Sequence, residues 1–230
     1  NYFILKKLLI ISFLLILTNC ENNENNMTVK VNVENFKKGN IYLQKISDSA
    51  LINIDSIFVK KNESIILKYN IDSPELFYLN LDVSDIDNRI EFFGEKGEIN
   101  IDTSLEKFNS DFKISGSSID SLYRDYLSVI KKFNNQKLDL IQLSFNLTKT
   151  ELDDSLIKVQ NQIKSLDKRQ YLYNLNYTVS NGNSFISPLV AINEFSESGK
   201  IVLDTIKNSM SKQVLESKYG KIFSDIVKNK

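Results

Sequence analysis

The sequence predicts an α+β protein, in which an N-terminal antiparallel β-sandwich or barrel is followed by a helical C-terminal region. Apolar and polar residues alternate from Met27 onward. Gly, Pro and Asn/Asp/Ser turns separate the short alternating runs at intervals of about eight to twelve residues. After Gly116 the apolar spacing changes to three and four residues. A period of two indicates strands and a period of about 3.6 indicates helices. We therefore expect a β-rich domain over 27–116 and a helical region over 117–230.

The strand predictions follow the alternation along the chain. Val29, Val31 and Val33 alternate with polar residues, which gives a half-buried strand one apolar face. Gly94 and Gly97 bracket two residues and predict a tight connection between two strands. The further predicted strands are 41–46, 51–59, 64–69, 76–81, 90–93, 98–102 and 112–115.

Two long helices are predicted from capping signals and apolar spacing. Ser117-x-x-Asp120 indicates a capping box, in which each side chain satisfies a backbone N–H of the first turn. Thr150-x-x-Asp153 indicates a second cap. The apolar residues of these helices fall within 119–133 and 152–166. Their steps of three and four are typical of a helix that packs along a partner.

Shorter helices are predicted towards the C-terminus. Ser187-Pro188 indicates an N-cap with proline at the first helical position. Two more helical segments are expected at 202–210 and 212–227, the second bent around Gly220.

The composition excludes several classes of function. The 230 residues include 29 Lys and Arg and 29 Asp and Glu, so no basic excess is present to neutralise nucleic-acid phosphates. The chain has no His, no Trp and one Cys. These counts remove the commonest general base, the commonest metal ligand and every two-cysteine redox motif. We therefore expect a protein that is not an enzyme and does not bind nucleic acid.

Acidic residues cluster at two places, and neither cluster predicts a metal site. Asp82, Asp85 and Asp87 are close together, but the segment lacks the glycine that a calcium loop needs for its sharp turn. A solvated loop explains them better. Asp153-Asp154 favours a helix N-terminus, where the helix dipole stabilises negative charge.

Two other groups of residues are candidate sites. Glu95 and Glu98 are paired carboxylates, for which surface solvation is the default interpretation. Tyr171, Tyr173 and Tyr177 could stack a sugar or an apolar ligand, although helix packing explains them as well. We predict no catalytic, cofactor-binding or metal-ligating residues, and no cofactor.

The N-terminal residues predict a lipid anchor. Lys6 and Lys7 precede the apolar run 8–17, which is about half the length needed to span a bilayer and suits a signal peptide. The following Leu17-Thr18-Asn19-Cys20 resembles the lipobox of bacterial lipoproteins, in which the cysteine becomes the acylated first residue.

This resemblance implies a signal peptide at 1–19, lipidation of Cys20 and a polar tether over 20–26. The alternative is a cleaved secretory peptide whose cysteine is incidental. The mature protein would be held in the cell envelope through acyl chains such as palmitate, with the outer membrane as the expected location.

Several turn and strand-start motifs resemble a known family. The front half is similar to the domain of unknown function 4369, found in envelope proteins of Bacteroidetes. The motifs are Gly39-Asn40-Ile41-Tyr42-Leu43, Ile54-Asp55-Ser56, Pro74-Glu75-Leu76-Phe77-Tyr78-Leu79, Phe93-Gly94-Glu95-Lys96-Gly97-Glu98-Ile99 and Ile114-Ser115-Gly116-Ser117.

In that family the domain often precedes a helical linker and a thioredoxin-like thiol–disulfide oxidoreductase domain. The helices here resemble the linker, and no Cys-x-x-Cys is present. The resemblance therefore implies a lipid-anchored module without the enzyme.

We expect a cell-envelope lipoprotein with a binding or assembly role. Its expected partners are membrane lipid, through acylated Cys20, and an envelope protein. The alternative is an accessory module that acts on a separate thiol–disulfide oxidoreductase. An enzyme of unfamiliar type ranks third.

Overall fold

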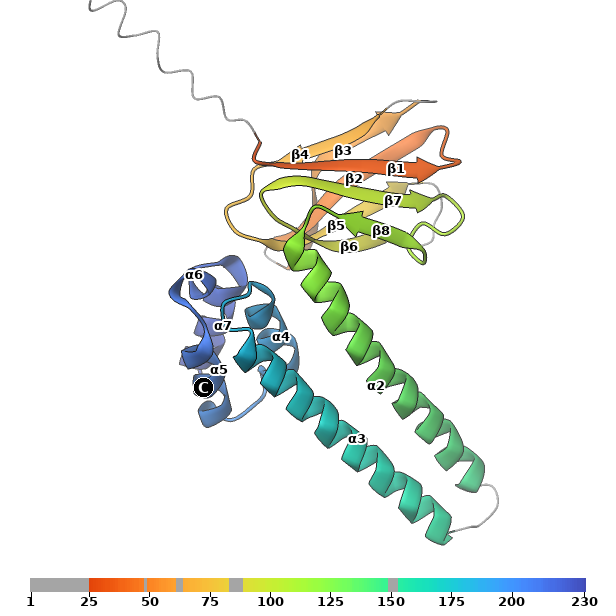
Figure 1. The fold of residues 1–230 in the computed structure, drawn as a ribbon, viewed down its shortest axis with the longest axis vertical. Helices are drawn as coiled ribbons and strands as arrows, with labels where there is room; N and C mark the ends of the chain where they lie inside the picture. Colours follow the sequence, from red (N-terminus) through yellow and green to blue (C-terminus); the bar gives the residue numbers. More distant parts are fainter. Residues whose placement is uncertain (1–24, 48, 61–63, 83–88, 149–152) are drawn as a thin grey trace, which may run out of the picture.

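Strands occupy the front of the chain and helices the back, which confirms the α+β prediction (Figure 1). The computed structural model describes residues 25–47, 49–60, 64–82, 89–148 and 153–230. The strands are β1 Met27–Glu34, β2 Gly39–Ser47, β3 Ala50–Val59, β4 Ile65–Tyr69, β5 Glu75–Asp82, β6 Arg89–Gly94, β7 Gly97–Ser104 and β8 Phe112–Ser115. The helices are α2 Ser118–Thr148, α3 Asp153–Ser180, α4 Ile186–Phe195, α5 Lys200–Ser209, α6 Lys212–Leu215 and α7 Lys218–Lys228.

The strands form a sandwich of two four-stranded sheets, not a barrel. One sheet has the order β4-β1-β7-β8 and the other has the order β3-β2-β5-β6. The expectation of a wholly antiparallel sandwich was wrong for one pair, because β1 and β7 are parallel. The reason is the path of the chain. Strands β2 and β6 both pair antiparallel with β5 and therefore run the same way. Since the chain reverses when it crosses between the sheets after β1 and after β6, β7 runs in the direction of β1.

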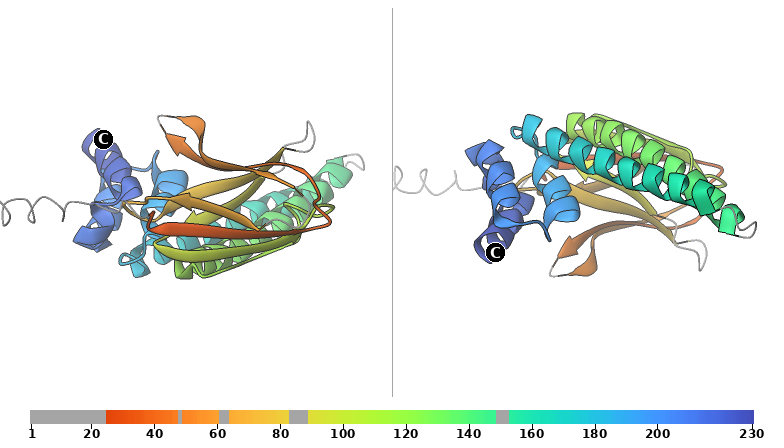
Figure 2. Two further views of the ribbon diagram at one scale, coloured as in Figure 1. Left: turned by 90° about the horizontal axis from the view of Figure 1, so that it is seen from above. Right: turned by 90° about the horizontal axis from the view of Figure 1, so that it is seen from below.

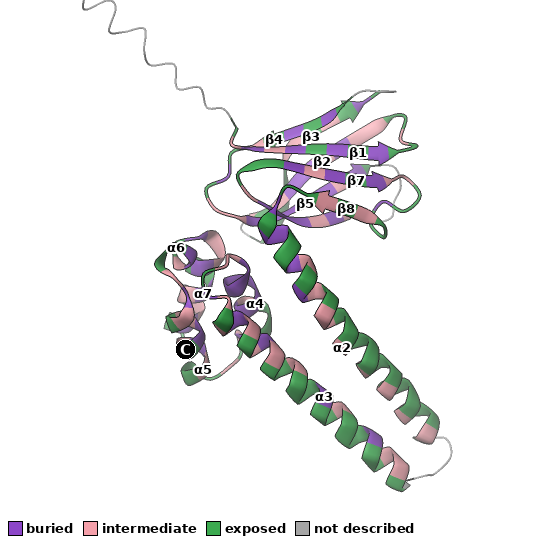
Figure 3. Ribbon diagram, in the orientation of Figure 1, coloured by how far each residue is buried: buried purple, intermediate pink, exposed green. Residues whose placement is uncertain are grey.

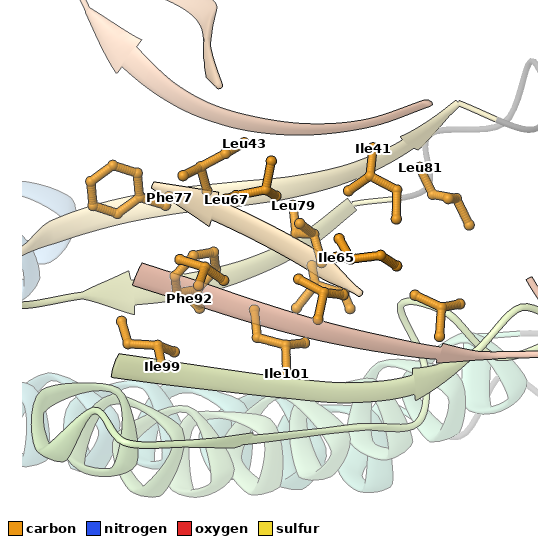
Figure 4. Close-up of a cluster of buried hydrophobic side chains, with 14 of the residues drawn as sticks. Ile41, Leu43, Ile65, Leu67, Phe77, Leu79, Leu81, Phe92, Ile99 and Ile101 are labelled. Carbon is orange, nitrogen blue, oxygen red and sulfur yellow. The ribbon is translucent and has the colours of Figure 1, made fainter. Parts of the chain in front are cut away.

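The sandwich core lies between the two inner faces, as the period of two predicts. In β1, Val29, Val31 and Val33 are buried while the residues between them are partly or fully exposed. The labelled side chains in Figure 4 point from both sheets into the shared interior. The rings of Phe77 and Phe92 are 5.9 Å apart there. Burial of such apolar area is the main term that stabilises the sandwich.

Helices α2 and α3 form a long antiparallel hairpin, called here the α2–α3 hairpin, that projects from the sandwich (Figure 1). At its base the Ser117 hydroxyl accepts a hydrogen bond of 3.0 Å from the Asp120 backbone N–H, as the capping box predicts. The Asp120 carboxylate, however, bonds to the sandwich rather than back to the cap. Thr150, the second predicted cap, lies outside the described residues.

The remaining helices, α4–α7, form a C-terminal lobe that packs beside the base of the hairpin (Figure 2). Its core includes Phe195, Leu203 and Phe223, all fully buried. Together with the sandwich, the lobe leaves the outer half of the α2–α3 hairpin largely exposed (Figure 3).

Two details of the lobe differ from prediction. Helix α4 begins at Ile186, so Ser187 is not its N-cap. The buried Ser187 hydroxyl instead donates to the carbonyls of Thr178 and Asn181. Pro188 still lies in the first turn, where a missing N–H costs no helical hydrogen bond.

The predicted helix 212–227 is interrupted at Glu216 and Ser217 rather than bent at Gly220. Ser217 caps α7 by accepting a hydrogen bond of 3.2 Å from the Gly220 N–H. Gly220 lies where a side chain would meet the Val214 carbonyl oxygen at 2.0 Å, so it permits close approach of α6 and α7.

Candidate functional site

The edge of the second sheet is covered by the first turns of α2. Strand β6 is an edge strand of that sheet. Asp120 Oδ1 accepts a hydrogen bond of 2.8 Å from the backbone N–H of Phe93. One turn later, the guanidinium of Arg124 donates to the backbone carbonyl of Glu91. This carboxylate and guanidinium therefore occupy the positions of a neighbouring strand's acceptor and donor, and they satisfy an edge that would otherwise be open to pairing.

The same two side chains pair with each other. Arg124 Nη2 lies 3.2 Å from Asp120 Oδ1, and the Asp120 side chain is 1% exposed. A buried carboxylate is tolerated only when it is paired and hydrogen-bonded. Tyr123, on the same turn, donates a hydrogen bond of 2.8 Å to the Glu91 carboxylate. The base of α2 is thus a network of charged and polar groups around one strand edge.

A second polar contact joins α7 to the start of β5. The carboxylate of Glu75 is buried and forms ion pairs with Lys45, at 3.1 Å, and with Lys218. The Tyr219 hydroxyl accepts a hydrogen bond of 3.1 Å from the Leu76 N–H, and the Ser73 hydroxyl accepts one from the Lys218 N–H. The C-terminal lobe is therefore bound to the sandwich by specific hydrogen bonds at residues far apart in the sequence.

An apolar cluster lies between these two contacts. It includes Phe93 from β6, Tyr123 from α2 and Leu189 from α4, with Tyr219 packed against it. The Phe93 ring meets the Tyr123 ring edge-on at 5.3 Å. Burial raises the pKa of Tyr123 and Tyr219, and the nearby Glu91 carboxylate acts in the same direction. Both hydroxyls have structural partners, since Tyr123 donates to the Glu91 carboxylate and Tyr219 accepts from the Leu76 N–H.

A pocket of about 440 Å³ opens beside this cluster, where the sandwich, the base of α2 and the C-terminal lobe meet. Its lining includes Asp72, Glu95, Lys96, Phe185 and Glu216. The lining therefore carries more negative than positive side chains. Glu95 Oε1 is already used, because it accepts from the Ser118 hydroxyl and the Ile119 N–H at the start of α2.

The outer half of the α2–α3 hairpin presents a different kind of surface. Leu138, Ile141 and Phe145 are 64%, 47% and 60% exposed, and their spacing of three and four places them on one face of α2. Leu143 and Ile157 are exposed nearby. Scattered exposed apolar residues are normal, but a contiguous stripe indicates an interaction surface.

The predicted tyrosine cluster divides between two contacts. Tyr173 and Tyr177 lie against Tyr126 in the hairpin, with ring centroids 6.2 and 4.8 Å away. Tyr171 points elsewhere and meets Phe195 of α4 edge-on at 5.3 Å. Helix packing explains all three, and they form no shared stacking platform.

The remaining predicted residues are separated in space or fall outside the description. Glu95 contacts the base of α2, whereas Glu98 pairs with Lys30 at 2.6 Å on the outer face of the first sheet. Asp82 accepts a hydrogen bond from Tyr42, while Asp85 and Asp87 lie outside the described residues. Cys20, together with the rest of 1–24, also lies outside them.

The sequence did not predict the two polar contacts that join the sandwich to the helices, one at Asp120 and one at Glu75. The sequence predicts only a capping role for Asp120 and no contact between Glu75 and Lys218. No spacing rule could pair positions 75 and 218. For Asp120 one signal was available: Arg124 lies four residues later in the same helix, and this spacing predicts an ion pair.

Comparison with family models identifies the front of the chain. The model described as a domain of unknown function, DUF4369, matches residues 27–123. Residues 27–123 belong to this family. The DUF4369 match begins at the first residue of β1 and ends at Tyr123 within α2, so it includes the bond between Asp120 and Phe93. No curated protein matched the chain.

Among the residues that the structure describes, none of the helices combines the length and apolar character that a bilayer crossing requires. In the same part of the chain, no three His, Cys, Asp or Glu side chains are grouped closely enough to hold a metal ion.

Proposed function

We propose that this protein is a membrane-anchored cell-envelope lipoprotein with a binding or assembly role. One observation carries the proposal: the single cysteine of the chain, Cys20, directly follows a basic and apolar leader in a sequence that resembles a lipobox. Each buried methylene of an acyl chain contributes roughly 0.8 kcal/mol, so two or three chains hold a protein stably at a membrane. The outer membrane is the proposed location.

The folded body supports binding rather than chemistry. Its polar networks at Asp120 and at Glu75 are occupied in joining the sandwich to the helices. Its exposed apolar stripe, Leu138, Ile141 and Phe145, is suited to a protein partner. A body held at a membrane and carrying such a stripe fits an assembly role.

Metabolic labelling with a fatty acid tests the anchor. The wild-type protein should carry the label and remain in the membrane fraction, whereas Cys20→Ala should lose both properties. A matched control moves the cysteine: Ser165→Cys in the Cys20→Ala background restores a thiol at an exposed position and should remain unlabelled. Label that persists in Cys20→Ala, or wild-type protein without label, would overturn the anchor.

The alternative is an accessory module for a separate thiol–disulfide oxidoreductase, which the resemblance to the DUF4369 family suggests. Affinity capture from solubilised envelopes separates the two roles. Co-purification of a thioredoxin-like protein, lost on Leu138→Asp, would favour the accessory role. Capture of the same chain, lost on that substitution, would favour assembly.

A further inference from the structure

The apolar stripe Leu138, Ile141 and Phe145 continues a face that the protein already uses for packing. Steps of seven residues connect Leu127 to Asn134 and then to Ile141 on this face. Leu127 packs against the apolar cluster that includes Phe93, Tyr123 and Leu189 of α4. Near the sandwich this face of α2 is therefore partly buried against α4, whereas Leu138, Ile141 and Phe145 are exposed. Figure 3 shows the outer half of α2 as largely exposed.

The base of the hairpin is also fixed to the lobe through α3. Asn174 donates a hydrogen bond of 2.7 Å to Glu194 of α4, and Tyr171 packs on Phe195. The lobe is thus fixed at the base of the hairpin, whereas Leu138, Ile141 and Phe145 lie nearer the tip and are exposed.

We infer that the stripe is a self-association surface on which a second copy of this chain docks with its hairpin antiparallel, related by a two-fold axis near Ile141. The inference deepens the assembly role proposed above and rests on it. A two-fold contact requires that residue i meet residue j while j meets i. The stripe has this property, because its large residues, Leu138 and Phe145, lie about equally far from Ile141. An antiparallel pair of α2 helices would place Leu138 of each copy against Phe145 of the other.

The charges of the hairpin agree with this direction. The ion pair of Lys137 with Asp167, 2.8 Å long, shows which residues of α2 and α3 are level. By that alignment, Ile141 is about level with residues 161–163 of α3. Asp154 is then about as far towards the tip as Lys168 and Arg169 are towards the base. Antiparallel docking would bring Asp154 of each copy about level with Lys168 and Arg169 of the other, whereas the three residues of the stripe are uncharged.

A cysteine cross-link tests the geometry in the full chain. Because a residue approaches its own symmetry mate only beside a two-fold axis, Ile141→Cys should form a disulfide-linked dimer when envelopes are oxidised. Gln136→Cys, exposed on a different face of the same helix, is the matched control and should remain monomeric. Both variants are made in the Cys20→Ala background as well, so that the native cysteine cannot supply the link.

A second measurement does not depend on a thiol. The detergent-solubilised wild-type protein should sediment as a dimer, and Leu138→Asp should sediment as a folded monomer with unchanged circular dichroism. Equal cross-linking at 141 and 136, or a wild-type monomer, would overturn the inference. Flotation with vesicles that requires Leu138 would also overturn it, because it would assign the stripe to lipid. Loss of label from Cys20 would refute the anchor alone, so the two failures are distinguishable.

Discussion

The Asp120 carboxylate accepts a hydrogen bond of 2.8 Å from the backbone N–H of Phe93, on the edge strand β6. Together with the donation from Arg124 to the Glu91 carbonyl, this bond lets side chains of a helix satisfy two backbone groups of a sheet edge. The base of the α2–α3 hairpin therefore supplies hydrogen-bond partners for backbone groups of β6. Movement of that base would leave those groups without partners.

Removal of the Asp120 carboxylate should destabilise the whole protein. Asp120→Ala leaves the Phe93 N–H without its acceptor and removes the ion pair with Arg124, so we expect the free energy of unfolding to fall by about 2–4 kcal/mol. Asp120→Asn, which keeps one acceptor oxygen, should cost less. Urea denaturation followed by circular dichroism measures both. Asp125→Ala, exposed on the same helix, is the control and should change stability by no more than about 0.5 kcal/mol. Equal losses at 120 and 125 would contradict the role of Asp120.

Alanine substitutions at two glycines separate the cost of an unfavourable φ from the cost of a steric clash. Gly97 and Gly116 both have positive φ, at 117° and 90°. A Cβ at Gly116 would lie 2.0 Å from the carbonyl oxygen of Glu98, whereas one at Gly97 would meet nothing within 4 Å. Gly97→Ala should therefore cost only conformational strain, about 1–3 kcal/mol. Gly116→Ala should cost more than about 4 kcal/mol or prevent folding. The comparison is read from thermal melts of the two soluble variants, and similar melting temperatures would refute it.

The cap of α7 controls how firmly the C-terminal lobe is held. Ser217 accepts the Gly220 N–H and donates a hydrogen bond of 2.6 Å to the Val214 carbonyl. Ser217→Ala should reduce stability by about 1–2 kcal/mol and increase amide hydrogen exchange in α7 first. Ser165→Ala, at an exposed position of α3, serves as control. Unchanged exchange in α7 would show that the cap is dispensable.

Strong alkali should unfold the protein. Burial raises the pKa of Tyr78 and of Tyr177 to about 12, from an ordinary value of 10.0. The unfolded chain therefore loses these protons at lower pH than the folded chain does. Their contribution to stability is complete below pH 10 and declines as the pH rises towards about 12. Burial opposes the charged form of Lys45, but Tyr69 and Glu75 raise its pKa overall, so it acts in the same direction.

Denaturant titrations at intervals from neutral pH to about pH 12 measure this dependence, with tyrosinate absorbance as a second signal. Tyr177→Phe should make stability decline less steeply with pH above 10, because one linked proton is removed. Constant stability across that range would contradict the assignment of buried tyrosines.

Most elements of the fold follow from local patterns. The strand predicted over 112–115 is β8 as observed, and 51–59 differs from β3 by one residue. Ser117 caps α2 as its spacing predicts. These agree because a period of two, or a hydroxyl three residues before an N–H, depends only on neighbours in sequence.

The partners of each element did not follow from such patterns. The parallel pairing of β1 with β7, the burial of Ser187 inside α4 and the bond from Asp120 to Phe93 all depend on segments distant in sequence. The same applies to the stripe on α2. The apolar spacing predicts packing for 119–133 and 152–166 only, and the exposure of Leu138, Ile141 and Phe145 follows from the folded structure.

The sequence by itself determined the order of strands and helices, the alternation that fills the sandwich and the placing of the single cysteine after an apolar leader. Only the tertiary structure decided which strands share a sheet, how a helix satisfies a sheet edge and which apolar face remains bare. The physical reason is range: periodicity and capping act between near neighbours, whereas burial and edge pairing depend on which distant surfaces the folded chain brings together.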